Sequence, residues 1–179
     1  MTNYRRYRVN GGCYFFTVAL AERSRRLLTE HIQILRTAFR EVKAARPFMI
    51  EAIVVLPDHL HGIWTLPESD DDFSLRWREI KAAFSRQLPK TERRSKSRVK
   101  KGEQGIWQRR FWEHAIRDEV DCQRHVDCIN YFTLLAICWV EICLGSNPGI
   151  SETCSMTLRS GANARMRSIA HQESFSTDN

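Results

Sequence analysis

The stretch Ile53-Val54-Val55-Leu56-Pro57-Asp58-His59-Leu60-His61-Gly62-Ile63-Trp64 decides the fold of this chain. It consists of two apolar runs separated only by Pro57-Asp58. Apolar runs of this length, rich in β-branched and aromatic residues, are typical of strands, and so short a connection requires the strands to be antiparallel. We therefore expect a pair of antiparallel strands over residues 48–56 and 59–66.

The second of these strands carries two histidines, His59 and His61, on either side of Leu60. Side chains alternate between the two faces of a strand, so both imidazoles are expected on one face and Leu60 on the other. Two neutral imidazoles side by side can bind a divalent metal ion, which can polarise a phosphodiester. The alternative is that both histidines are half-buried residues of the sheet face without a ligand.

The segments around this pair predict two further strands and three helices. A buried strand is expected over 13–20. A helix is expected over 29–45, with Thr29 as its cap and Arg46-Pro47 at its end. A second helix is expected over 73–88, a fourth strand over 113–117, and a third helix from Asp118-Glu119. This order predicts an α+β fold: a ferredoxin-like antiparallel sheet of about four strands with helices packed on its faces.

The composition narrows the classes of function. The chain has 179 residues, 42% of them hydrophobic, and a net charge of +7, which favours one globular domain with an anionic partner such as nucleic acid. No apolar run approaches the roughly 20 residues of a membrane span, and the N-terminus lacks the apolar core of a signal peptide. The six cysteines form no Cys-x-x-Cys pair. We expect a reduced, cytoplasmic protein without a membrane partner.

Two segments differ in composition from the rest. Residues 86–110 hold ten Lys and Arg against two Glu, which predicts an exposed basic loop that contacts DNA or RNA. The alternative is a solvated linker. After about residue 130 the apolar pattern has no clean period and a Ser- and Asn-rich tail follows. We therefore expect a domain over 1–131 and a divergent, poorly ordered tail over 132–179.

Five motifs together resemble the REP-associated tyrosine transposases, which belong to the His-hydrophobic-His superfamily of single-strand nucleases. The similarity runs from about residue 3 to residue 131. The motifs are Asn3-Tyr4-Arg5-Arg6-Tyr7, Val54-Val55-Leu56-Pro57-Asp58-His59-Leu60-His61, Ile63-Trp64-Thr65-Leu66-Pro67, Phe73-Ser74-Leu75-Arg76-Trp77-Arg78 and Ile106-Trp107-Gln108-Arg109-Arg110-Phe111-Trp112-Glu113-His114.

The resemblance implies a protein that binds short palindromic hairpins of single-stranded DNA. In the family, hairpin DNA is nicked and rejoined through a 5′-phosphotyrosine with Mg²⁺ or Mn²⁺, which places the metal on His59 and His61. The residues expected at the DNA are Arg5, Arg6, Arg109, Arg110 and Trp107, because guanidinium groups pair with phosphates and guanine edges and indoles stack on bases. Phe111 and Trp112 are further stacking candidates, whereas His114 and His125 are expected to be structural or surface groups.

The chain departs from the family where the nucleophile is expected. The family helix reads Val-Asp-Tyr-Ile, then two variable residues, then Asn-Pro, and here Cys128 stands at the tyrosine position and Phe132 at the asparagine position. Tyr131, about 60° around the helix from residue 128, is a possible substitute. A DNA sequence that encodes Asn-Pro-Val can encode Thr-Leu-Leu when it is read one nucleotide later, and Thr-Leu-Leu is the sequence of residues 133–135. A frameshift near residue 132 is therefore our hypothesis for the divergent C-terminus.

Three functions follow from these observations. The first is a transposase-like enzyme that nicks and rejoins hairpin DNA, with Cys128 or Tyr131 as nucleophile. The second is a catalytically dead remnant that binds hairpin DNA with a steep salt dependence. The third, an RNA-binding ferredoxin-like domain, ranks last because the two central strands are mainly aliphatic. The sequence leaves enzymatic activity, the metal, the hairpin sequence and the choice between monomer and homodimer open.

Overall fold

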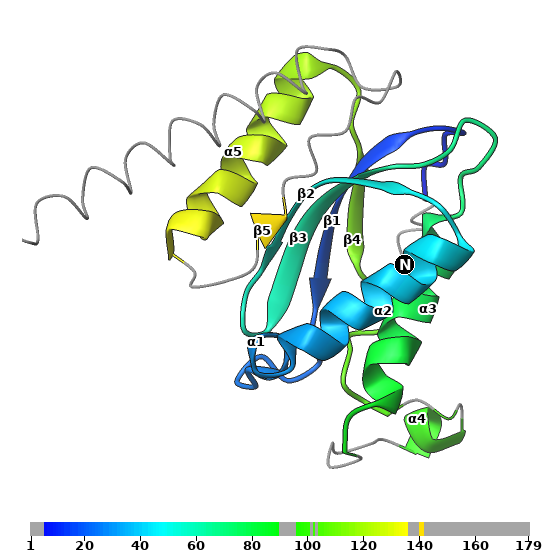
Figure 1. Cartoon of the computed structure of the whole chain (residues 1–179), viewed down its shortest axis with the longest axis vertical. Helices are drawn as coiled ribbons and strands as arrows, with labels where there is room; N and C mark the ends of the chain where they lie inside the picture. Colours follow the sequence, from blue (N-terminus) through cyan, green and yellow to red (C-terminus); the bar gives the residue numbers. More distant parts are fainter. Residues whose placement is uncertain (1–5, 90–95, 101, 103, 136–139, 142–179) are drawn as a thin grey trace, which may run out of the picture.

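The structure, a computed structural model, describes residues 6–89, 96–100, 102, 104–135 and 140–141 (Figure 1). Its strands are β1 (Cys13–Ala19), β2 (Met49–Val55), β3 (His59–Thr65), β4 (Trp112–Ala115) and β5 (Val140–Glu141). Its helices are α1 (Leu27–Glu30), α2 (Ile32–Ala45), α3 (Phe73–Arg86), α4 (Lys96–Lys100) and α5 (Glu119–Leu135). The strands form one sheet in the order β4-β1-β3-β2-β5.

Every pairing in this sheet is antiparallel, and β3 lies at its centre. The β2–β3 hairpin turns at residues 56–58, where the Leu56 amide donates to the His59 carbonyl. In the β1–β3 pair, Thr17 lies opposite His61. The expected antiparallel pair of strands and the ferredoxin-like α+β fold are confirmed, with the short β5 as an additional strand beside β2.

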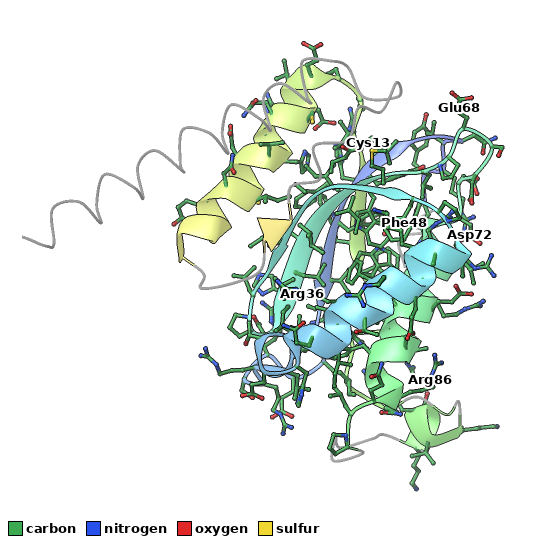
Figure 2. All side chains as sticks on the ribbon, viewed as in Figure 1. Cys13, Arg36, Phe48, Glu68, Asp72 and Arg86 are labelled. Atoms are coloured by element: carbon green, nitrogen blue, oxygen red, sulfur yellow. The ribbon has the colours of Figure 1, made fainter. Side chains whose placement is uncertain are left out.

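Helices α2 and α3 cover one face of the sheet (Figure 1). Their apolar side chains recur at helical spacing and pack on the aromatic residues of β1 and β3. Trp64 of β3 stacks on Trp77 of α3 with ring centroids 4.2 Å apart. Asp72 begins α3 by accepting a hydrogen bond from the Leu75 amide at 3.0 Å, and it lies at that end of the helix in Figure 2. This layer contains most of the core.

Helix α5 covers the opposite face of the sheet (Figure 1). Cys122, Val126 and Ile129 lie on one side of the helix and pack against Phe15, Ala52, Val54 and Ile63. This second, smaller cluster holds the helix that carries residue 128 over the same sheet face as His59 and His61. The sheet thus separates a large apolar core from the face that carries the candidate site.

The first predicted helix differs from the structure. The chain forms two helices, α1 and α2, with His31 between them, and no side chain caps the start of α2. Thr29 lies inside α1, and its hydroxyl donates to the carbonyl of Arg26 at 3.1 Å rather than accepting from a helix amide. Burial explains the break, because Leu27 and Leu28 both pack into the core and require a turn of their own. The strand β4 also begins one residue earlier than expected, at Trp112.

The expectation of an exposed basic loop over 86–110 needs correction in part. Within this segment the structure describes the short helix α4, whose side chains are not buried, but Ile106 and Trp107 are buried in the core. Trp107 forms a β-bridge with Leu20, and the Ala21 amide donates to the Ile106 carbonyl at 2.8 Å. These apolar residues anchor the end of the segment beside β1. Residues 90–95, 101 and 103 lie outside the described part.

The C-terminal tail falls mostly outside the described residues. Helix α5 extends across the expected boundary between residues 131 and 132 to Leu135, and β5 pairs with Ile53 and Val54 of β2. The expectation for residues 136–139 and 142–179 cannot be compared with the structure. In the part of the chain that the structure describes, no helix has the length and apolar character that crossing a membrane requires.

Candidate metal and nucleic-acid site

His59 and His61 lie on the face of β3 that α5 covers, while Leu60 lies in the core on the other face. The two imidazole centroids are 5.0 Å apart and their planes meet at 88°. The ring of His61 also stacks on Phe15 of β1 at 5.5 Å. Strand alternation therefore brings the two imidazoles together, as the His-x-His spacing predicts.

Both imidazoles are oriented by a hydrogen bond at Nδ1. His59 Nδ1 lies 2.7 Å from Oδ1 of Asp58, whose other oxygen pairs with Arg23. His61 Nδ1 lies 2.9 Å from Oγ1 of Thr17 on β1. A carboxylate only accepts, so His59 Nδ1 donates this hydrogen bond, which leaves Nε2 as the nitrogen that could bind a metal. Such a bond at the second ring nitrogen is what fixes metal-ligating histidines in proteins.

The protonation of this pair suits a metal ligand. Burial, as the largest cause, and the neighbouring His59 and Arg23 together lower the pKa of His61 to about 4. Burial alone would raise the pKa of Asp58, but the hydrogen bonds from His59 and Arg23 outweigh burial and lower it. At neutral pH the site therefore has a neutral imidazole at His61 beside an ionised carboxylate, the forms in which these groups bind cations.

Residue 128 belongs to α5 and packs against the apolar cluster between α5 and the sheet, on the sheet face that carries His59 and His61. Cys128 is half-buried against the apolar cluster of α5 and the sheet, and burial raises the pKa of its thiol. A thiol with a raised pKa holds its proton at neutral pH and is a poor nucleophile. Tyr131, the other candidate, has 62% of its surface exposed. Phe132 lies in α5, but its side chain is outside the described part.

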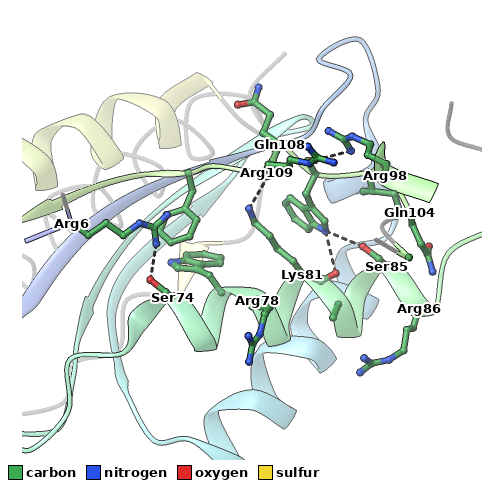
Figure 3. A pocket seen from close by; sticks show the side chains of 17 residues that line it. Arg6, Ser74, Arg78, Lys81, Ser85, Arg86, Arg98, Gln104, Gln108 and Arg109 are labelled. Atoms are coloured by element: carbon green, nitrogen blue, oxygen red, sulfur yellow. Dashed lines mark hydrogen bonds between the residues drawn. The ribbon is translucent and has the colours of Figure 1, made fainter. Parts of the chain in front are cut away.

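A basic pocket of about 750 Å³ lies on the other side of the sheet, between α3 and the segment 104–111 (Figure 3). Among the described residues that line it, six are cationic and none is a carboxylate. They come from the N-terminal segment, α3, α4 and the residues before β4. These side chains are Arg6, Arg78, Lys81, Arg86, Arg98 and Arg109.

Arg6 is held at the rim of this pocket by three partners. Its guanidinium donates to Ser74 Oγ at 2.6 Å, lies 3.5 Å from Glu113 Oε1, and sits over the Phe111 ring at 4.2 Å (Figure 3). Lys81 donates to the Gln108 carbonyl at 3.1 Å. Burial, with the charge of Arg6, lowers the pKa of Lys81 to about 8. The pocket therefore brings positive charges close together, and a bound anion would reduce the repulsion between them.

The other residues expected at the DNA occupy different positions. Arg109 donates to Ser97 Oγ at 2.8 Å and Arg110 is exposed. Trp107 is only 7% exposed, and its indole N–H donates to Ser85 Oγ and to the Lys81 carbonyl, so its ring is part of the wall of the pocket. Arg5 lies outside the described residues. The structure thus brings Arg6, Arg109 and Trp107 to one pocket, on the opposite side of the sheet from the histidine pair.

A third cluster contains residues that sequence reasoning treated as structural or surface groups. His114 of β4 and both Asp121 and His125 of α5 lie together, with one ligand atom from each within 4.8 Å of the others. Asp121 and His125 have the i, i+4 spacing of one helix side, which is the one signal for the cluster in the sequence. His114 has no such signal, because its place depends on how β4 turns into α5.

No protein-family model matches the chain. The chain is 50% identical over 141 residues to the REP-associated tyrosine transposase of Escherichia coli (strain K12), covering 79% of this chain and 77% of that protein. A protein of Haemophilus influenzae (strain ATCC 51907 / DSM 11121 / KW20 / Rd), likewise named for this family, is 48% identical over 132 residues, which is 73% of this chain and 75% of that one.

A solved structure is also similar, that of the REP-associated tyrosine transposase bound to a REP hairpin. It is 50% identical in sequence and superimposes with a TM-score of 0.63, covering 75% of this chain and 74% of that one. At this identity and coverage the chain resembles these relatives in amino-acid sequence as well as in fold.

Proposed function

The chain belongs to the REP-associated tyrosine transposase family, and on this premise we propose that it binds palindromic hairpins of single-stranded DNA. The observation that supports the proposal most is the basic pocket, where six cationic side chains from separate segments of the described chain line one cavity. A polyanion releases condensed counterions when such cations neutralise its phosphates. The related transposase whose structure includes a REP hairpin supports the same ligand.

Contacts to the hairpin are assigned to the side chains that surround the pocket and its rim. The guanidinium of Arg6, held between Phe111 and Glu113, offers a preoriented donor fork to phosphate or guanine. Lys81 and Arg109 supply further phosphate contacts, and exposed Arg110 extends the basic surface. Trp107 acts by forming the pocket wall. Arg5 adds a contact from the N-terminal segment.

His59 and His61 are the proposed ligands of a divalent cation, Mg²⁺ or Mn²⁺. The neutral imidazole of His61 and the hydrogen bonds of His59 with Asp58 and of His61 with Thr17 fit this role, and imidazole ligands favour Mn²⁺ of the two. A bound cation supplies charge neutralisation at the non-bridging oxygens of a phosphodiester. Asp58 and Thr17 would help to hold the two rings in place around such a cation.

We propose that this chain binds the hairpin without cleaving it. The position of the family tyrosine is occupied by Cys128, whose thiol stays protonated because burial raises its pKa. A thiol is also shorter than a phenol and cannot reach the same phosphorus. The other possibility, a nicking and rejoining enzyme that uses Cys128 or Tyr131, is the outcome that the experiment below must exclude. Residues 1–131 form the DNA-binding domain of the proposal, with 132–179 as a divergent tail.

The proposal includes a cytoplasmic location, which is where the DNA of the two bacterial relatives lies. It leaves open whether the protein acts as a monomer or a homodimer. Hairpin binding can be tested without knowing the oligomeric state.

The test uses a labelled single-stranded hairpin and a strand of equal composition that cannot pair. The full chain, Cys128→Tyr, His59→Ala and Arg6→Ala are compared by gel shift and, after incubation with Mn²⁺, on a denaturing gel. We expect hairpin-selective binding by the full chain, weakened by Arg6→Ala, with no DNA-linked protein band. Equal affinity for both strands contradicts hairpin binding. A DNA-linked band that His59→Ala abolishes shows instead that the chain is an active nuclease.

A further inference from the structure

We propose that His114, Asp121 and His125 form a second metal site, one for a transition-metal ion of the Zn²⁺ class, which ties strand β4 to the start of helix α5. This site differs in place and in role from the pair His59 and His61. It serves to fix the position of α5 and does not depend on hairpin binding.

The three ligands converge from two elements that meet at one corner of the fold. His114 Nε2 lies 2.7 Å from Asp121 Oδ2, and His125 Nδ1 lies 3.6 Å from Asp121 Oδ1. The two imidazole rings face each other with centroids 4.8 Å apart and planes 22° from parallel. One carboxylate thus lies against two imidazoles, the donor set of a His₂-carboxylate zinc site.

Hydrogen bonds around the cluster hold each ligand in place. Asp121 Oδ2 accepts from the Arg117 amide at 3.1 Å, while the Asp121 amide donates to Asp118 Oδ1 at 2.8 Å. His125 Nδ1 lies 2.7 Å from the Asp121 carbonyl, to which it can only donate, so the lone pair of this ring is on Nε2. An imidazole bonded to a backbone carbonyl through one nitrogen is the arrangement that orients zinc-bound histidines.

The cluster is open enough for an ion to enter and close enough to contract around it. The side chains of His114, Asp121 and His125 are 22%, 17% and 16% exposed. Their ligand atoms lie within 4.8 Å of one another, whereas zinc bonds of about 2.0–2.2 Å require ligand atoms roughly 3.3 Å apart. Binding would therefore need small side-chain adjustments that bring the more distant ligand atoms closer and separate His114 Nε2 from Asp121 Oδ2, and water could complete the coordination.

The two metal sites are separate but adjacent. The His125 ring lies 4.6 Å from the Phe15 ring, and the ring of Phe15 also stacks on His61 at 5.5 Å. Phe15 therefore keeps the two sets of imidazoles apart. Fixing α5 at His125 also fixes the next turn of the helix, which carries Cys128 over the sheet. A metal at the triad would thus hold the nucleophile position of the family in place.

Metal-free full-length protein is titrated with Zn²⁺ in dialysis and with Co²⁺ in the visible spectrum, in which coordinated Co²⁺ absorbs. His59→Ala/His61→Ala removes the first site and His114→Gln/His125→Gln removes the second. His31→Gln, which lies in neither cluster, controls for loss of a histidine. Circular dichroism and thermal unfolding check the fold of each variant.

We expect the His59→Ala/His61→Ala variant to retain one bound ion with a Co²⁺ spectrum, and a rise in Tm on addition of Zn²⁺. Both effects should be lost on adding His114→Gln/His125→Gln. If that combined variant fails to fold, His125→Gln alone should weaken Zn²⁺ binding by at least about tenfold. Equal Zn²⁺ binding by the full chain and the folded triad variant overturns the proposal. If the triad substitutions abolish binding of one ion and the His59→Ala/His61→Ala substitutions abolish none, the second site is upheld. The same result refutes metal binding at His59 and His61.

Discussion

The hydroxyl of Thr17 on β1 lies 2.9 Å from Nδ1 of His61 on β3, directly across the strand pair. This contact links the imidazole of His61 to the neighbouring strand, and it crosses a sheet face that is apolar at Phe15 and Ile63. This contact restricts rotation of the His61 ring beside His59. The register of β1 and β3 therefore places the residue that orients one of the two imidazoles, that of His61.

Thr17→Val tests the contribution of this contact. Valine keeps the shape and the strand propensity of threonine but removes the hydroxyl, so the fold should persist while the His61 ring loses its orientation. We expect Mn²⁺ affinity to fall about tenfold, the lower end of the effect of removing such a partner. Isothermal titration against the full chain measures the change, with Thr29→Val as the control. An unchanged affinity shows that sheet packing alone orients the ring.

Lys81 predicts a pH dependence of hairpin binding. Its folded pKa is lowered to about 8, so the ammonium charge is present below pH 8 and is lost as the pH rises through that value. We expect hairpin affinity at fixed salt to decrease between pH 7 and pH 9, because one phosphate contact disappears. Lys81→Arg should bind equally at both pH values, since a guanidinium keeps its charge. If the hairpin affinity of both proteins decreases equally with pH, Lys81 does not contact the hairpin.

Arg76 is expected to stabilise the fold. It is 2% exposed, pairs with Asp70 at 2.8 Å, and donates to the carbonyls of Pro47 and Asp72 at 2.7 Å and 3.1 Å. Arg76→Leu leaves these acceptors without a donor and should lower the free energy of unfolding by about 3 kcal/mol. Urea unfolding measures the change, and Arg78→Leu, exposed on the same helix, should alter stability by under about 0.5 kcal/mol. Equal effects of the two substitutions contradict this role.

Local patterns were sufficient to predict the sheet and much of the site. The alternation at His59, Leu60 and His61 predicts which side chains share a face, because strand geometry is set by the backbone alone. The helix break at His31 was not predictable in the same way, since it depends on how Leu27 and Leu28 pack into the core. Local periodicity does not include that tertiary constraint.

The remaining features depend on contacts between distant segments. The basic pocket unites Arg6, Lys81 and Arg109, which are separated by more than a hundred residues at the extremes, and only the fold brings them together. The resemblance predicts Trp107 as a residue that stacks on DNA bases, whereas in the structure its indole N–H donates to partners within α3. His114 joins Asp121 and His125 only because β4 is connected to α5 by a short turn.

The reactivity of Cys128 decides between a binding protein and a covalent enzyme. Burial raises the pKa of its thiol, so the thiolate that reacts with alkylating agents is scarcer than in a free cysteine at the same pH. We expect iodoacetamide to modify Cys128 at pH 7.5 at least about tenfold more slowly than it modifies a cysteine-containing peptide, with the rate rising toward alkaline pH. Peptide mass spectrometry resolves this site, and Cys13, whose pKa is raised to about 12 by burial, should react more slowly still. If Cys128 is modified faster than the cysteine of the free peptide, its surroundings stabilise the thiolate. Cys128 would then be a reactive nucleophile rather than a poor one. The same protein should then be tested for a Cys128-dependent adduct with hairpin DNA.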